Sequence, residues 1–261
     1  MNLDSSGNAD QQHPAPHALA QELSRVAGLN AQRRADPALA AALERLGNWQ
    51  GRRLAQTYAD LAAQPRFAAA IEFFRTDLYG GTDFTQRDAD LERVVTVMMR
   101  MLPEGVIATI AKAVELHRLS QELDRSLLAR LPRADAAFTV ADYARAYRRM
   151  GNRAEREHQI RLIGEIGATL DVFVRKPLIY AALVMMRQPA RLAGLFALHD
   201  FLERGFAAFR RMDGADEFLA TIAQRERALM EALFAGDVAP FPDPSSPAAT
   251  SGSPAVIAGE K

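Results

Sequence analysis

The sequence predicts an all-α protein, a compact bundle of about nine or ten helices. Apolar residues recur at the spacing of one helical face along most of the chain. One such stripe consists of Leu116, Leu119, Leu123, Leu127 and Leu131. No sequence segment alternates apolar and polar residues with a period of two, and β-branched residues are sparse, so strands are not expected.

The first half of the chain contains five expected helices, near residues 16–27, 37–63, 65–78, 85–102 and 104–131. Pro37, Pro65 and Pro103 each stand just ahead of an apolar-periodic run. Proline is tolerated there because the first N–H groups of a helix have no partner within it. Thr85 followed by Asp88 resembles a capping box with Asp in place of Glu.

The second half contains five more expected helices, near residues 139–150, 153–174, 177–187, 189–211 and 214–235. Thr139 and Asp142 have the spacing of a capping box, and Phe138 and Tyr143 have that of a hydrophobic staple around it. Pro177 precedes the longest apolar run of the chain. These signals place the helix starts more firmly than the helix ends.

Both ends of the sequence are poor in apolar residues that could form a core. Residues 1–15 are rich in Asn, Asp, Gln, Ser and Pro, and residues 236–261 in Pro, Ala, Ser and Gly. Such segments bury too little apolar surface to offset chain entropy, so we expect both tails to be disordered. Residues 16–235 then form one domain, with 132–138 as the best candidate for a boundary between two sub-bundles.

Composition excludes several classes of function. The 32 basic and 32 acidic residues give no net charge, which argues against nucleic-acid binding. There is no cysteine, so disulfides, thiolate catalysis and iron–sulfur clusters are excluded. We see no signal peptide, and the apolar run at 178–186 is too short to span a bilayer, so a soluble cytoplasmic protein is expected. No catalytic sequence template is present.

The most specific segment lies at residues 73–84, where aromatic residues, carboxylates and a Gly-Gly pair stand between two helical runs. Its aromatic residues have helical spacing and are expected in the core, and Gly80-Gly81 permits a tight helix exit. The carboxylates do not have the spacing of a calcium loop, so no metal site is expected. The residues left without an obvious structural duty form a candidate interaction surface: Asp77, Arg87 and Asp90.

The same segment carries a resemblance to a known family. Residues 73–79 read FFRTDLY and are followed by Gly-Gly, Asp83-Phe84 and Arg87-Asp88. This pattern resembles the FFLEELY-motif proteins, a family of uncharacterised bacterial proteins, and the likeness extends over about residues 49–226. The chain departs from that motif at residues 75–77, where Arg, Thr and Asp replace Leu, Glu and Glu. The resemblance implies no activity, substrate or site.

His199 is a second candidate. On the expected helix at 189–211 it aligns with Leu195, Leu202, Phe206 and Phe209, so it should face the core. A neutral imidazole in an aromatic pocket can ligate haem iron. More often such a histidine donates a hydrogen bond to a backbone carbonyl or a carboxylate. A haem or another apolar ligand near His199 is therefore the alternative function.

Arginines form the third candidate. Arg145, Arg149 and Arg153 fall roughly on one helical stripe, which could bind an anion or an acidic partner, unless Gly151 breaks it. The alternative is an ordinary solvated face. Taken together, the sequence favours a non-catalytic helical interaction or adaptor protein whose partner is another protein.

Overall fold

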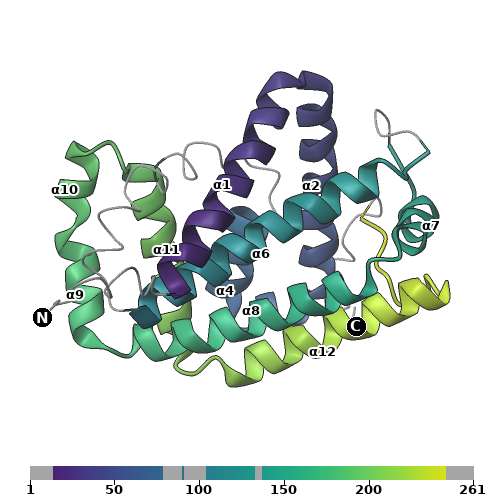
Figure 1. The fold of residues 1–261 in the computed structure, drawn as a ribbon. Helices are drawn as coiled ribbons and strands as arrows, with labels where there is room; N and C mark the ends of the chain where they lie inside the picture. The colour runs from purple at the N-terminus through teal and green to yellow at the C-terminus, as the bar shows by residue number, and fades with distance from the viewer. Residues whose placement is uncertain (1–13, 79–89, 91–103, 133–136, 245–261) are drawn as a thin grey trace, which may run out of the picture.

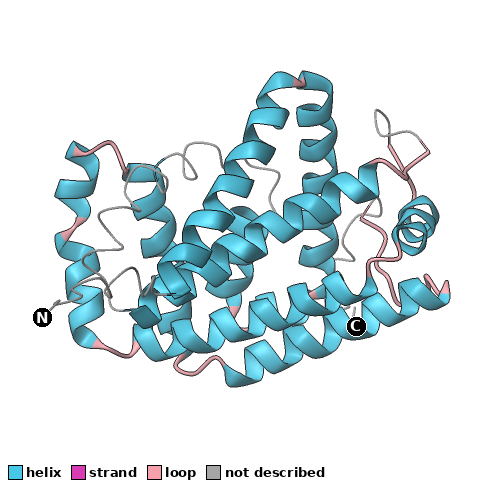
Figure 2. Cartoon of the chain, viewed as in Figure 1, coloured by secondary structure: helices cyan, strands magenta, loops and turns pink. Residues whose placement is uncertain are grey.

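The computed structural model describes residues 14–78, 90, 104–132 and 137–244. Within these ranges the chain forms helices joined by short loops, and no strand occurs there (Figure 2). The all-α prediction is confirmed. The helix expected at 85–102, its Thr85–Asp88 cap and the Gly80-Gly81 exit lie outside the described residues.

The elements are α1 (Pro14–Ala35), α2 (Pro37–Thr57), α3 (Ala59–Ala62), α4 (Ala68–Phe73), the π-helix η1 (Phe74–Leu78), α6 (Glu104–Leu128), α7 (Val140–Met150), α8 (Arg153–Val174), α9 (Pro177–Met185), α10 (Arg187–Leu192), α11 (Phe196–Met212) and α12 (Asp216–Ala235). The long helices α6, α8 and α12 run the length of the molecule. The antiparallel pair α1 and α2 packs on α6, α7 lies at one end, and α9 to α11 lie at the other (Figure 1).

Side-chain caps fix the starts of α2 and α7. Before α2, the Asp36 carboxylate accepts hydrogen bonds from the N–H groups of Ala38 and Leu39, both at 3.0 Å. Before α7, Thr139 and Asp142 form the expected capping box. These caps matter because the first N–H groups of a helix have no partner in the helix itself.

The hydrophobic staple at the start of α7 and the C-terminal end of this helix also follow from its sequence. The rings of Phe138 and Tyr143 lie 6.5 Å apart across the capping box, as predicted. The helix ends at Gly151, which has φ of 67°, a value that glycine adopts without steric cost. Gly151 therefore separates α7 from α8 and breaks the arginine stripe.

Helix α1 is longer than expected, because it continues through Gly28 to Ala35 instead of ending near residue 27. A glycine inside a helix costs only about 0.5–1 kcal/mol, which tertiary contacts can offset. One such contact is the hydrogen bond from Arg125 to the carbonyl of Leu29, at 2.8 Å. The described part of α1 also buries Leu19 against α6.

Two expected helices are interrupted. The one predicted at 37–63 breaks at Tyr58, whose backbone leaves helical geometry (φ −115°, ψ 21°) while its hydroxyl donates to Glu226 at 2.7 Å. The one predicted at 189–211 is divided by Gly194, with φ of 70°. The first break accompanies a tertiary contact, that of Tyr58 with Glu226. The second break follows from the backbone conformation of Gly194.

Two large apolar clusters share α8 and α12. One, the Phe218 core, also gathers side chains from α2, α3, α4, η1 and α11, and the other, the Trp49 core, from α2, α6 and α7. Both contain residues from before and after 132–138, so that connection does not separate two independent cores.

The packed part of the chain extends beyond residue 235, where the disordered tail was expected to begin. Phe241 is 7% exposed and lies 5.8 Å from the ring of Trp49 and 5.4 Å from that of Tyr143. A single aromatic side chain buries enough apolar surface to hold a short proline-rich segment against the Trp49 core.

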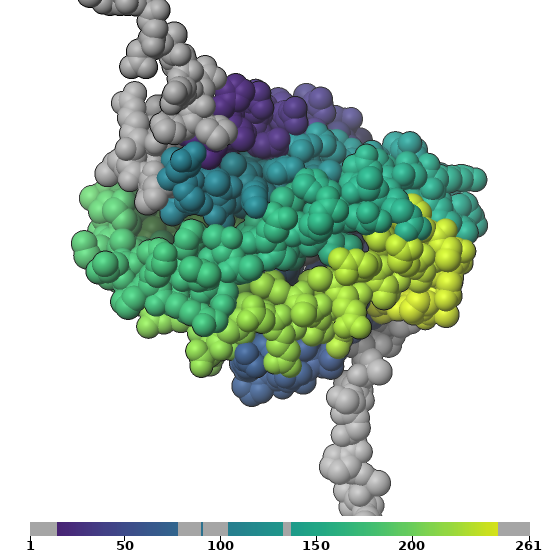
Figure 3. Space-filling model, turned by 60° about the horizontal axis from the view of Figure 1, so that its bottom comes forward, coloured from purple at the N-terminus to yellow at the C-terminus, as the bar shows by residue number. Residues whose placement is uncertain are grey.

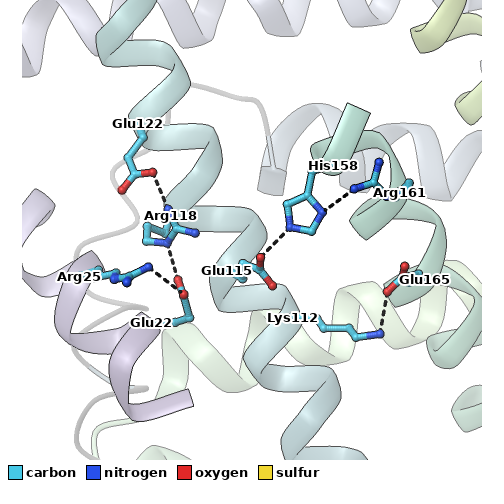
Figure 4. Close-up of polar contacts among 9 residues, drawn as sticks. All are labelled: Glu22, Arg25, Lys112, Glu115, Arg118, Glu122, His158, Arg161 and Glu165. Carbon is cyan, nitrogen blue, oxygen red and sulfur yellow. Dashed lines mark hydrogen bonds and ion pairs between the residues drawn. The ribbon is translucent and has the colours of Figure 1, made fainter. Parts of the chain in front are cut away.

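Polar contacts hold α6 between α1 and α8 (Figure 4). The pairs are Arg118 with Glu22 on α1, His158 on α8 with Glu115, and Lys112 with Glu165 on α8. The Lys112–Glu165 pair is half exposed and spans 2.6 Å. A half-exposed pair of this kind orients the two helices more than it stabilises the fold, because water screens its charges.

Two glycines on α8 provide a test of how closely α8 approaches α12. A Cβ at Gly167 would lie 2.4 Å from Cδ2 of Leu219 on α12, whereas a Cβ at Gly164 would meet nothing within 4 Å. Gly164→Ala is expected to raise the free energy of unfolding by about 0.5–1 kcal/mol. Gly167→Ala is expected to be less stable than Gly164→Ala by about 1–3 kcal/mol, measured by urea unfolding. Equal stabilities would contradict the close approach.

Candidate functional site

The side chain of Asp77, at the end of η1, is buried in the interior of the protein. Its carboxylate accepts a hydrogen bond from Nη2 of Arg204 at 2.5 Å and one from the hydroxyl of Thr76 at 2.8 Å. Because Arg204 lies on α11, this pair joins η1 to α11. The expectation that Asp77 has no structural duty is wrong.

Asp90 is also an interior residue, with an exposed fraction of 0%. Its carboxylate accepts a long hydrogen bond, 3.4 Å, from the N–H of Leu198 in the first turn of α11. A carboxylate there supplies a partner for a helix N–H and complements the helix dipole. Arg87 lies outside the described residues. Asp77 and Asp90 therefore anchor α11 instead of forming an exposed interaction surface.

The three candidate arginines do not form one stripe. Arg145 and Arg149 are exposed on α7, and Arg153 begins α8 beyond Gly151. Arg153 pairs with Glu231 of α12, and its guanidinium group lies 4.7 Å from the ring of Phe234. It thus joins α8 to α12. Arg145 and Arg149 stay candidates for surface contacts.

His199 is mostly buried, with its side chain 11% exposed. Its Nε2 donates to the carbonyl of Leu183 at 2.9 Å, and its Nδ1 lies 3.7 Å from the Glu203 carboxylate. An iron ligand needs an unprotonated ring nitrogen, so ligation through Nε2 would break the first of these bonds. Leu202, expected on the same inner face, is 43% exposed.

The helix α9 has an unusual environment. Its nine residues, PLIYAALVM, carry no charge, and none of them is buried. Ile179 and Leu183 pack against the Phe218 core from one side. The opposite side is exposed at the spacing of one helical face: Leu178, Ala181, Ala182 and Met185. We call these four residues the α9 surface.

The α9 surface has large apolar residues and a basic rim. Leu178 is 85% exposed and Met185 is 76% exposed. On the neighbouring elements Met186, Leu192 and Phe196 are also more than half exposed. The flanking cations are Arg175 and Lys176 before α9, and Arg187 and Arg191 after it. Two of them also form ion pairs within the chain, Arg175 with Asp171 and Arg187 with Glu203. Contiguous exposed apolar residues within a polar rim are typical of binding surfaces.

A cavity of about 50 Å³ lies inside the molecule, between α2, α7, α8 and α12. Its polar lining residues are Gln50, Arg53, Tyr143, Tyr147, Arg156 and Gln159, with Glu226 beside them. We call it the Arg53 cavity. Periodicity does not reveal this cavity, because its lining comes from four separate helices and from Phe241 beyond α12.

Arg53 and Glu226 form a paired charge at this cavity. Two guanidinium nitrogens of Arg53 donate to the two carboxylate oxygens of Glu226, at 2.5 and 3.3 Å, although the residues are 173 positions apart. Tyr58 adds a third bond, at 2.7 Å. Burial raises the pKa of Glu226, but the Arg53 charge and these hydrogen bonds outweigh burial and lower the pKa below its usual value.

A second arginine, Arg156, is also buried, with an exposed fraction of 8%. Its Nη1 donates to the amide oxygen of Gln159 at 3.0 Å, and its guanidinium group lies 4.9 Å from the ring centre of Tyr147. Nearby, Gln50 donates to Asp124 at 3.0 Å, and burial raises the pKa of Asp124. Two arginines and two acids thus meet in the interior.

Residues 29–240 match the model of a family described as a domain of unknown function, DUF8198. The chain belongs to the DUF8198 family. The matched range includes the α9 surface and every residue that lines the Arg53 cavity except Phe241. No curated protein and no solved structure matches the chain.

Two classes of feature are absent from the residues of this DUF8198 chain that the structure describes. In the part of the chain that the structure describes, none of the helices has both the length and the apolar character needed to cross a membrane. The same residues contain no group of three or more His, Asp or Glu side chains placed to hold a metal ion. The α9 surface and the Arg53 cavity are two described features that could bind a partner or a ligand.

Proposed function

We propose that this DUF8198 protein is a non-catalytic interaction module that binds another protein through the α9 surface. The supporting observation is an uncharged nine-residue helix with no buried residue. A helix that is apolar on all sides is normally buried, because exposed apolar surface is unfavourable in water. A partner would cover Leu178 and Met185 and remove that cost.

We also propose, from the FFRTDLY segment, that this chain is an FFLEELY-motif protein of the bacterial cytoplasm.

The partner that fits is an amphipathic helix with acidic residues beside its apolar face. Ala181 and Ala182 are small residues between Leu178 and Met185, so a second helix can approach closely there. The basic rim before and after α9 attracts acidic side chains. A second copy of the chain fits less well, since an antiparallel pair of these surfaces would bring Arg175 and Lys176 against Arg187 and Arg191.

The test is a double variant, Leu178→Asp with Met185→Asp, made in the full chain. A protein captured by the wild type is purified and its affinity measured. We expect binding to weaken at least about 100-fold in the variant, because buried anchor residues carry most of the energy of an interface. Thermal unfolding should stay unchanged, because both side chains are exposed. Arg145→Asp, on the distant α7, is the matched control and should bind normally.

Two outcomes would contradict this proposal. One is a captured partner that binds the double variant as well as the wild type. The other is binding to vesicles of anionic lipid that the same two substitutions abolish, which would make α9 a membrane-surface helix. Arg191→Glu separates charge from apolar contact: it should weaken the binding of an acidic protein partner without changing the fold.

The alternative function is a haem bound near His199. It is supported by the burial of this histidine, whose side chain is 11% exposed, but its Nε2 already donates to a backbone carbonyl. Expression with added haem should give a Soret absorption band that His199→Ala removes, if this alternative holds. A colourless protein would leave the interaction module as the better proposal.

A further inference from the structure

We propose that the Arg53 cavity is a binding site for a short-chain carboxylate, separate from the α9 surface and independent of what that surface binds. The cavity has a charged and polar side and an apolar side. The polar side comes from α2, α7 and α8. The apolar side comes mainly from α12, through Leu229, Met230 and Leu233. A short-chain carboxylate has the same two-sided character.

The charge of the lining favours an anion. Two guanidinium groups, those of Arg53 and Arg156, face one lining carboxylate, that of Glu226. Both terminal nitrogens of Arg53 are used by Glu226, while its buried Nε has no hydrogen-bond partner among the described residues. Buried N–H donors of an arginine are costly unless an acceptor completes them. A carboxylate oxygen supplies such an acceptor.

The nearby acids limit how much negative charge the site accepts. Glu226 lines the cavity, and Asp124 lies behind Gln50, which donates to it. A dianion such as phosphate would be repelled by Glu226 and would place oxygens against the apolar wall. A monoanion with one carboxylate and an apolar tail avoids both penalties.

The size of the cavity selects small members of this class. By the same measure of volume one water molecule needs about 10–15 Å³, so about 50 Å³ holds roughly three to five water-sized groups. Acetate and propionate have that many non-hydrogen atoms. Larger carboxylates would have to displace Leu229 or Leu233, which are closely packed in the Trp49 core.

One charged group of the cavity lining is partly exposed to solvent. The surface of the molecule is hollowed between α8 and α12, the two helices that line much of the cavity (Figure 3). Among the charged lining groups, the side chain of Glu226 is 19% exposed, whereas that of Arg53 is 9% exposed. We expect a ligand to enter on the side of Glu226, the more exposed of these two groups.

The experiment titrates the purified full chain with sodium acetate, sodium propionate or sodium phosphate at constant ionic strength. Calorimetry gives the affinity, and thermal unfolding gives the stabilisation that follows from binding to the folded state. We expect acetate and propionate to bind and phosphate not to. Arg156→Gln should weaken binding at least about tenfold, since the cavity lining loses one of its two guanidinium groups. Arg149→Gln, an exposed neighbour on α7, should bind as the wild type does.

A second variant keeps the proposal testable if Arg156→Gln fails to fold. Arg156→Lys keeps the charge but loses the planar fork of the guanidinium group, so binding should weaken while the fold is retained. The proposal is overturned if the folded wild type binds neither carboxylate at concentrations up to about 100 mM, which would mean a water-filled cavity. It is also overturned if phosphate binds more tightly, or if neither Arg156 variant alters binding.

Discussion

Glu226→Ala is expected to lower the free energy of unfolding by about 3–5 kcal/mol. The substitution leaves Arg53 buried without its carboxylate partner, and it removes the acceptor of the Tyr58 hydroxyl. A buried unpaired charge loses its hydration and gains nothing in return. Equilibrium unfolding in urea measures the change.

The matched control is Glu231→Ala, which removes an acid from the same helix. Glu231 pairs with Arg153, but both side chains are about half exposed, at 50% and 45%. Its loss should cost less than about 1 kcal/mol. Combining Arg53→Met with Glu226→Leu should recover much of the stability, because no unpaired charge remains. Equal losses for Glu226→Ala and Glu231→Ala would contradict the buried pair.

The same pair sets a dependence on pH. Because the pKa of Glu226 is lower in the folded protein than its usual value, its ionised form stabilises the fold. That contribution is complete above the unfolded pKa of about 4.3 and is lost as the pH falls through the folded pKa. The stability difference between wild type and Glu226→Ala should therefore shrink below about pH 4.

Phe218→Ala is expected to cost about 3–5 kcal/mol. Phe218 is 0% exposed, and its ring lies 5.7 Å from the rings of both Phe67 and Phe74. Alanine would leave a cavity where three segments of the chain meet, and the surrounding helices cannot close it fully. The measurement is again urea unfolding.

Phe196→Ala is the control for this prediction, since it truncates the same residue type at an exposed position. Phe196 is 59% exposed at the start of α11, so the change should be within about 0.5 kcal/mol. If both phenylalanine variants lose the same stability, the assignment of Phe218 to the core is wrong. Phe196 also adjoins the α9 surface, so its variant can weaken partner binding while leaving the fold intact.

Local sequence signals predicted local structure well. The capping box of Thr139 and Asp142, the staple of Phe138 and Tyr143 and the start of α2 at Pro37 are all confirmed. Each depends on groups within a few residues of one another, so the sequence contains the whole interaction. The predicted C-terminal ends of the helices were less accurate than their predicted starts. Gly28 does not end α1, and Tyr58 interrupts α2, because contacts with α6 and α12 outweigh local preference.

The candidate site was predicted less well, because it depends on which helices meet. Periodicity places Asp77 and Arg156 on faces of their helices, but it does not say what lies opposite those faces. Asp77 meets Arg204, and Arg156 meets Gln159 and Tyr147 inside the protein. The sequence analysis places Asp77 in a candidate interaction surface, whereas the structure buries its side chain. The sequence shows that the run at α9 is apolar and too short for a membrane span, but it does not show that this helix is exposed.

The sequence by itself determined that this chain is helical, where most of its helices start, and which apolar stripes form the core. Those properties follow from the helical period and from caps whose partners are neighbours in the chain. Only the tertiary structure decided that Arg53 pairs with Glu226, that a polar cavity lies between α2, α7, α8 and α12, and that one side of α9 stays uncovered. Such features depend on the packing of segments far apart in sequence, which periodicity does not encode.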